Sequence, residues 1–220
     1  MSDASTRPIA RRLSRAPLGA SMRIRRAWSM PNSETFSIPP IAEFVHAWLS
    51  GSQVSVDPFA RNCSWATYTN DLNPTTSAQY HQDAEEFLQS MVSQGVVADL
   101  VIFDPPYSPR QIKELYAEIG KPVTKHDTQN SALYARVRKS IRSILAPGGT
   151  VLSFGWNSCG MGKGFEIVEL LLVAHGGAHN DTICMAETHL TQRAPDSLKA
   201  GVLSLPESVK VESVLPAMSG

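Results

Sequence analysis

The sequence has few cysteines and no long apolar run. Its three cysteines, Cys63, Cys159 and Cys184, are scattered without a CxxC pair, which argues against a disulfide framework and a structural zinc site. No apolar stretch approaches the roughly 20 residues that cross a bilayer, and nothing resembles the core of a signal peptide. We therefore predict a cytoplasmic protein without metal and without membrane contact.

The chain also lacks a net charge. Lys and Arg together number 20, as do Asp and Glu, so overall charge gives no case for a polyanionic partner. The first 26 residues nevertheless hold a single acid, Asp3, against seven arginines: Arg7, Arg11, Arg12, Arg15, Arg23, Arg25 and Arg26. Such a start suits a nucleic-acid arm, a transit peptide or a solvated tail, and composition leaves the three open.

Both ends of the chain lack sustained periodicity. Residues 1–30 are rich in Arg, Ser and Pro, and we expect them to form a disordered tail. Residues 192–220 have spaced prolines and little aromatic content, and we expect a flexible tail there too. Residues 31–191 remain as a single folded domain, without internal repeats.

Strand and helix patterns alternate within that domain. The periodicity predicts strands over 53–59, 65–74, 98–104 and 150–156, and helices over 38–51, 83–95, 110–120 and 131–145. Residues 165–176 and 181–190 can supply a closing antiparallel hairpin around a Gly- and His-rich turn. This order predicts an α/β, Rossmann-like fold with a mostly parallel sheet and helices on both faces.

Acidic residues end three of these strands. Asp57, Asp71 and Asp104 each follow a β-rich run, and Asp83 opens a helix. Singly they suit ordinary turns or a helix N-cap. In one parallel sheet they lie at the carboxyl edge, where ligands bind. Since an acid after the second strand suits ribose hydroxyls and no GxGxxG is present, a nucleoside cofactor other than a dinucleotide fits best.

The stretch Asp104-Pro105-Pro106-Tyr107 resembles the DPPY motif of S-adenosylmethionine-dependent amino-methyltransferases, the group that contains N6-adenine DNA methyltransferases. Five other segments resemble that family in the same order: FSIPPIAEF (36–44), VDPFARN (56–62), TNDLNP (69–74), HQDAEEFL (81–88) and APGGTVLSFGW (146–156). The resemblance covers roughly residues 30–190. It implies S-adenosyl-L-methionine as cofactor and a small DNA adenine-N6 methyltransferase of the orphan or phage type, in a bacterial or phage-infected cell.

The resemblance assigns roles to residues. Catalysis falls to Asp104, Pro105, Pro106 and Tyr107. Cofactor binding falls to Phe36, Ile38, Pro39, Asp57, Pro58, Phe59, Ala60, Asn62, Asp71, Leu72, Asp83 and Ala84. Arg110, Lys113, Arg136 and Arg138 are candidates for contacts with nucleic-acid phosphates, although cations on a solvated helix face look the same. Metal ligands are not implied.

The implied mechanism makes physical sense of the motif. The Asp104 carboxylate and the Pro105 carbonyl accept hydrogen bonds from the exocyclic amino group of a flipped adenine, so that its lone pair points at the methyl group for in-line displacement. The ring of Tyr107 stacks on the flipped base. The two prolines stiffen the loop that carries these groups.

One segment departs from the family. Ala60, Arg61, Asn62 and Cys63 stand where the first loop has glycines, which permit positive φ and close approach to a ligand. We expect Asn62 to provide the left-handed residue of the turn, because asparagine tolerates that conformation. A catalytically degenerate protein that only binds nucleic acid or acts as a subunit is therefore one alternative, and an RNA N6-adenine methyltransferase is another.

No stretch is long enough for a separate target-recognition region. We expect the loops at 105–130 and 155–165, or the Arg-rich start, to contact DNA or RNA. Relaxed sequence specificity follows, unless a partner subunit or a homodimer completes target recognition.

Overall fold

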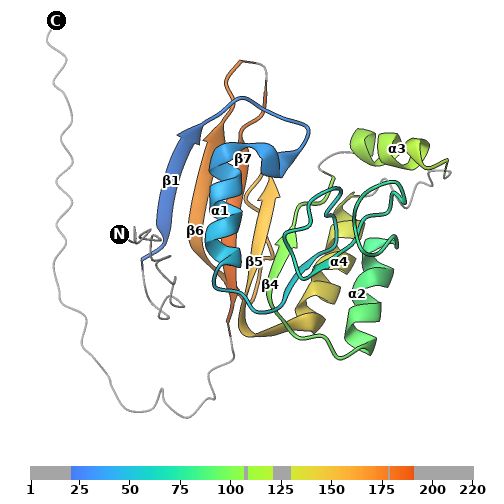
Figure 1. The fold of residues 1–220 in the computed structure, drawn as a ribbon. Coiled ribbons are helices and arrows are strands. Elements are labelled where there is room, and N and C mark those ends of the chain that lie inside the picture. Colours follow the sequence, from blue (N-terminus) through green and yellow to red (C-terminus); the bar gives the residue numbers. More distant parts are fainter. Residues whose placement is uncertain (1–20, 107–108, 121–129, 178, 191–220) are drawn as a thin grey trace, which may run out of the picture.

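The computed structural model describes residues 21–106, 109–120, 130–177 and 179–190. Tyr107 and the predicted C-terminal tail from residue 192 lie outside these ranges. The described residues form one sheet with helices on its two faces (Figure 1). This arrangement positions the loops that follow the strands at one edge of the sheet.

The sheet has seven strands in the order β1-β6-β7-β5-β4-β2-β3. Its strands are β1 (Arg23–Trp28), β2 (Ser55–Asp57), β3 (Tyr68–Thr69), β4 (Ala98–Phe103), β5 (Leu145–Gly155), β6 (Phe165–Ala174) and β7 (Thr182–His189). β7 lies antiparallel between β5 and β6, and every other pair is parallel. The predicted α/β fold, with a mostly parallel sheet and a closing hairpin of β6 and β7, is confirmed.

The strand β1 corrects the predicted N-terminal tail. Residues 23–28 fall within 1–30, but they pair in parallel with β6 at the edge of the sheet. Arg23 and Arg25 reach Glu169 of β6 at 3.4 and 2.9 Å. Glu169 is only 2% exposed and needs such partners, since an unpaired buried carboxylate is strongly unfavourable. Two of the N-terminal arginines therefore stabilise the sheet.

Four α-helices belong to the described part of the chain: α1 (Pro39–Leu49), α2 (Ala84–Ser93), α3 (Pro109–Glu118) and α4 (Asn130–Ile144), with a 3-10 turn η1 (Thr35–Ser37) before α1. α1 begins with two prolines, whose fixed φ suits a first helical turn. The Asp83 side chain caps α2 by accepting a hydrogen bond from the amide of Glu85 at 2.9 Å. None of the described helices is long and apolar enough to cross a membrane.

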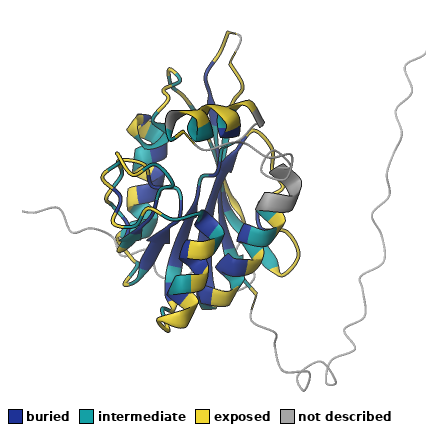
Figure 2. Cartoon of the chain, turned by 90° about the vertical axis from the view of Figure 1, so that its right-hand side faces the viewer, coloured by how far each residue is buried: buried dark blue, intermediate teal, exposed yellow. Residues whose placement is uncertain are grey.

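Alternate residues of β4 build two cores. Leu100 and Ile102 pack with Phe44 of α1 on one face of the sheet. Val101 and Phe103 pack with α2 and α4 on the other. Figure 2 shows the resulting distribution, with buried residues in the strands and exposed residues on the outer faces of the helices. Because both faces of β4 are covered, its carboxyl end at Asp104 is fixed from both sides.

Candidate active site

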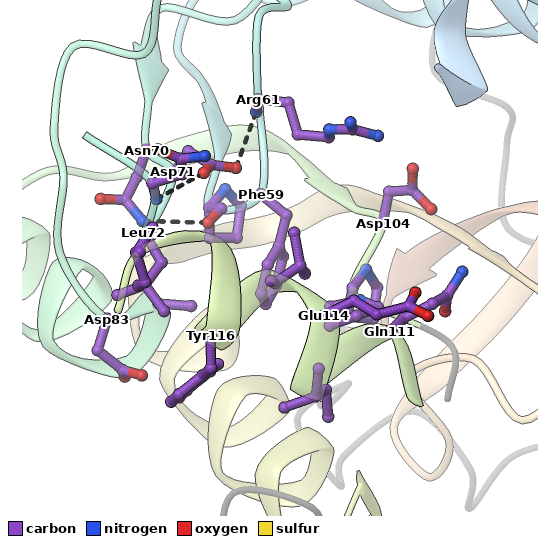
Figure 3. A pocket seen from close by; sticks show the side chains of 18 of the residues that line it. Phe59, Arg61, Asn70, Asp71, Leu72, Asp83, Asp104, Gln111, Glu114 and Tyr116 are labelled. Carbon is purple, nitrogen blue, oxygen red and sulfur yellow. Dashed lines mark hydrogen bonds between the residues drawn. The ribbon is translucent and has the colours of Figure 1, made fainter. Parts of the chain in front are cut away.

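Two cavities adjoin at the carboxyl edge of the sheet. The first, of about 290 Å³, is walled by the segments that follow β2, β3 and β4 and by α3. The second, of about 280 Å³, lies between residues 34–37 and 59–65. Both are lined by Thr35, Phe59, Arg61 and Asp104, so Asp104 stands at the boundary between them. Figure 3 shows residues that line the first cavity.

Most of the residues predicted to bind a cofactor line these cavities. The first cavity has Pro58, Phe59, Asp71, Leu72, Asp83 and Ala84 in its wall. The second has Phe36, Phe59, Ala60 and Asn62. Ile38, Pro39 and Asp57 line neither cavity: Ile38 is buried under α1, and Pro39 begins that helix.

Asp57 lies beneath the first loop. It is 1% exposed, and its Oδ1 accepts a hydrogen bond from the amide of Phe59 at 3.0 Å. Burial raises the pKa of this carboxyl well above its usual value; the Phe59 hydrogen bond opposes the shift, and the charges of Asp104 and Asp71 add to it. Asp57 therefore holds the loop from within.

Asp71 presents its carboxylate to the first cavity (Figure 3). Its Oδ1 accepts from the amide of Asn73 at 2.8 Å, and its Oδ2 accepts from the amide of Arg61 at 3.1 Å. Burial raises the pKa of this carboxyl against the opposing effect of those hydrogen bonds. A carboxylate offers about four lone-pair sites, so it retains capacity for hydroxyl groups of a ligand.

Asn70 fixes the segments around Asp71, a role that sequence reasoning missed. It is fully buried, and its Nδ2 donates to the carbonyls of Pro58 and Gln82 at 3.1 and 3.0 Å. Its Oδ1 accepts from the amide of Gln82 at 3.0 Å. One side chain thus joins the loops after β2 and β3 to the start of α2.

Gln82 lies in the wall of the first cavity. Its Oε1 is buried and has no hydrogen-bond partner among the described residues. Buried acceptors are normally satisfied, so this oxygen is an exception among the residues around the cavity. Gln82 immediately precedes Asp83, which the sequence singled out.

Arg61, and not Asn62, is the left-handed residue of the first loop. Its φ is 50°, the only positive φ of a non-glycine among the described residues. Its guanidinium donates to the carbonyl of Ser33 at 2.8 Å and pairs with Glu34 at 3.4 Å. Asn62 instead accepts a hydrogen bond from the amide of Ser77 at 3.1 Å. The turn expected from glycine therefore forms around an arginine that lines both cavities.

The loop after β4 carries the predicted catalytic residues. Asp104 is half-buried, and Pro105 and Pro106 line the first cavity beside it. The hydroxyl of Tyr134, on α4, donates to the carbonyl of Pro106. Burial raises the pKa of Tyr134 to about 12, so the hydroxyl stays a donor at neutral pH. Sequence reasoning placed Tyr134 on an amphipathic helix without connecting it to this loop.

The helix α3 forms part of the wall of the first cavity. In Figure 1 it lies above α2 and α4. Its inner side contributes Gln111, Ile112, Leu115 and Tyr116, none of which the sequence singled out. The amphipathic spacing of these residues was the available signal. They give the cavity a partly apolar wall opposite Asp71.

The four residues predicted to contact nucleic-acid phosphates line neither cavity. Arg110 and Lys113 are exposed on α3, where Arg110 pairs with Glu114 at 2.7 Å. Arg136 pairs with Glu85 at 2.9 Å and so joins α4 to α2. Arg138, also on α4, has a buried Nε without a hydrogen-bond partner. In the ranges that the structure describes, no cluster of His, Cys, Asp and Glu side chains could hold a metal ion.

The sequence matches no model of a known protein family and no curated protein. Its structure is similar to those of SMU.776, assigned as a methyltransferase and solved with SAH (13% identity, TM-score 0.46), and TrmN from Thermus thermophilus (14%, 0.42). It is also similar to yhhF from Escherichia coli, likewise assigned as a methyltransferase (11%, 0.47). The matches cover 66%, 70% and 74% of this chain, and 48%, 49% and 91% of the other chains. The chain thus spans about half the length of the first two proteins.

Proposed function

We propose that this protein transfers a methyl group from S-adenosyl-L-methionine to the N6 amino group of adenine in DNA. The observation that carries the proposal is the position of Asp104 at the boundary of two cavities. One cavity suits the nucleoside part of a cofactor, and the carboxylate beside it suits an amino group that reacts there. The Asp-Pro-Pro sequence at that point is the motif that the resemblance identifies.

The first cavity fits an adenosine. Asp71 has lone pairs left for ribose hydroxyls. Leu72 and Ile112 provide apolar contacts for a planar ring. Its volume of about 290 Å³ is just below the range of small-molecule sites, roughly 300–1,000 Å³.

The second cavity suits the charged remainder of the cofactor. The rings of Phe36, Phe59 and Trp65 line it, together with Asp104 and with the ion pair of Arg61 and Glu34 at 3.4 Å. Aromatic faces attract a cation. When bound, S-adenosylmethionine supplies a methyl group on a positively charged sulfur atom, and the three rings are matched to that charge.

Asp104 and Pro105 act on the acceptor. The carboxylate and the carbonyl accept hydrogen bonds from the amino group and orient its lone pair for in-line attack. The hydrogen bond from Tyr134 to the Pro106 carbonyl fixes the loop. The Asp104 carboxylate and the Pro105 carbonyl are therefore already positioned when the adenine arrives. An adenine in duplex DNA reaches this loop only after it leaves the base stack.

The test combines labelled transfer with cofactor binding. Protein, tritiated S-adenosylmethionine and DNA or RNA are incubated, and the nucleic acid is digested to nucleosides. We expect label in N6-methyldeoxyadenosine. Asp104→Ala should lower transfer at least about 100-fold, as removal of a preorganised hydrogen-bonding group does. Cofactor affinity measured by calorimetry should stay largely intact. Glu43→Ala, on the exposed face of α1, is the control and should behave as the unaltered protein.

Three outcomes would overturn parts of the proposal. Label only in N6-methyladenosine from RNA would exclude DNA as the acceptor. An active Asp104→Ala variant would exclude the role given to that carboxylate. Absence of cofactor binding at millimolar concentration would favour a second candidate, a protein of this fold that binds nucleic acid without transferring methyl groups.

The second candidate has one observation in its favour. Arg61 stands in the loop where the resembling family has glycine. It lines both cavities, and its guanidinium contacts Ser33 and Glu34. A glycine there would leave that volume to a ligand. Arg61→Gly separates the two candidates. If the Arg61 side chain prevents cofactor binding, the substitution should restore binding; if the unaltered protein already binds the cofactor, no binding has to be restored.

A further inference from the structure

On the side of β4 opposite β2, Asp104 lies next to the end of β5 and the loop that follows it. The cavity walls come from segments after β2, β3 and β4 and from α3, whereas the other neighbour of β4 in the sheet is β5. Phe103 of β4 is in register with Ser153 of β5, so both strands end at the same edge. With strands about 4.8 Å apart, the chain after Gly155 runs within roughly 10 Å of Asp104.

That loop, residues 156–164, begins with an exposed tryptophan. Trp156 is 45% exposed although its indole is one of the largest apolar groups in the chain. Asn157, Ser158 and Cys159 follow it and are also exposed. An aromatic face at the carboxyl edge of the strand next to the catalytic loop lies where a flipped base would approach Asp104.

Two charged side chains, from β7 and α4, hold this loop in place. Glu187 of β7 is 3% exposed; its Oε1 accepts from the amide of Met161 at 2.8 Å, and its Oε2 accepts from the hydroxyl of Ser153 at 2.6 Å. Arg142 of α4 donates to the carbonyls of Met161 and Lys163 at 2.6 and 3.0 Å. Burial of a carboxylate is costly, and here it fixes the path of a loop whose tip is exposed.

We propose that Trp156 is a contact residue for the acceptor, which stacks its base on the indole while Asp104 holds the amino group. Glu187 and Arg142 are positioning residues that keep the loop in the required conformation. The proposal rests on the function given above and deepens it, because it places the methyl-acceptor site on the β5 side of Asp104. It requires a nucleobase that is unstacked, either in a single strand or flipped out of a duplex.

The experiment measures binding of nucleic acid, which does not depend on methyl transfer. The probes are fluorescein-labelled, single-stranded 20-nucleotide DNA and RNA with one adenine, titrated by fluorescence anisotropy. Trp156→Ala should weaken binding about 5- to 150-fold, the effect expected from the loss of one base–aromatic stack. Trp156→Phe should retain most of the affinity. Calorimetry should give the same cofactor affinity for Trp156→Ala as for the unaltered protein.

Trp28 provides a matched control. It is 63% exposed at the carboxyl end of β1, on the same edge of the sheet but four strands away from β4. Trp28→Ala should change the affinity less than about twofold. A second readout uses 2-aminopurine in place of the adenine: its fluorescence should be quenched by the unaltered protein and by Trp28→Ala, but not by Trp156→Ala.

The outcomes separate this proposal from the proposed function. Equal affinity of Trp156→Ala and the unaltered protein, or an equal loss in Trp28→Ala, overturns the stacking role even where methyl transfer is observed. Failure of the unaltered protein to bind either oligonucleotide overturns it too. If the unaltered protein binds and Trp156→Ala does not, but no methyl group is transferred, the acceptor site stands and the methyltransferase function falls.

Discussion

Gly160 lies against the buried carboxylate of Glu187, and replacing it with alanine tests how the loop is held. A Cβ at Gly160 would lie 2.3 Å from Oε1 of Glu187, at a φ of 44°. Gly162, two residues on, has a φ of 73° and nothing within 4 Å of its Cβ position. Both glycines have a positive φ, but only a Cβ at Gly160 would clash with another residue. Gly162→Ala is therefore the matched control.

The expected magnitudes follow from these contacts. A left-handed alanine costs about 1–2 kcal/mol at either position. At Gly160 the carboxylate must also move, which breaks its hydrogen bonds with Ser153 and Met161. Hydrogen bonds to charged groups contribute about 1.5–3 kcal/mol each. We therefore expect Gly160→Ala to lower the free energy of unfolding by about 4–8 kcal/mol and Gly162→Ala by about 1–2 kcal/mol.

The assay is urea unfolding followed by circular dichroism for both single variants, for Glu187→Ala and for the double variant Gly160→Ala/Glu187→Ala. Without the carboxylate, the alanine at position 160 should cost only the conformational term, so the double-mutant cycle should show strong coupling. If Gly160→Ala does not fold but the double variant does, the Glu187 carboxylate is likewise shown to be the source of the clash. Equal costs at Gly160 and Gly162, or a cost unaffected by Glu187→Ala, would refute the clash.

Three further predictions concern the loops around Asp104. Burial raises the pKa of Asp57 in the folded protein. The carboxyl therefore contributes stability below its unfolded pKa near 4, and this stability is lost as the pH rises through its folded pKa, at up to about 1.4 kcal/mol per pH unit. Asp57→Asn should remove this dependence from free energies of unfolding measured across pH. Tyr134→Phe removes the donor to Pro106 and should lower the transfer rate constant about 2- to 10-fold without changing cofactor affinity, as single-turnover kinetics and calorimetry can check. Arg61→Gly should be more stable to urea than Arg61→Ala by about 1–2 kcal/mol, because only the alanine keeps a side chain at a φ of 50°; equal stabilities would contradict the strain.

Local sequence patterns were sufficient to predict the elements and the edge that carries the site. The apolar run 98–103 reads as a strand buried on both faces, and β4 packs against α1 on one face and α2 and α4 on the other. Asp83 before an amphipathic run predicts a capped helix, and it caps α2. Parallel strands bring their following residues to one edge by geometry alone, so it was predictable that Asp71 and Asp104 lie at the same edge.

Contacts between distant residues decided what the sequence left open. β1 is a strand because its backbone pairs with β6, where Arg23 and Arg25 also reach Glu169, whereas local composition indicates only a charged tail. Arg61 rather than Asn62 takes the positive φ because its guanidinium reaches Ser33 and Glu34, which local propensity does not register.

The sequence by itself determined the α/β order, the acids at the strand ends and the Asp-Pro-Pro loop, since each depends on residues adjacent in the chain or on one element's periodicity. Only the tertiary structure decided that Asp57 lies beneath the loop, that Tyr134 donates to the Pro106 carbonyl and that Asn70 joins the loops after β2 and β3 to the start of α2. Burial and hydrogen-bond satisfaction depend on what other segments bring to a position, and the local pattern does not contain that information.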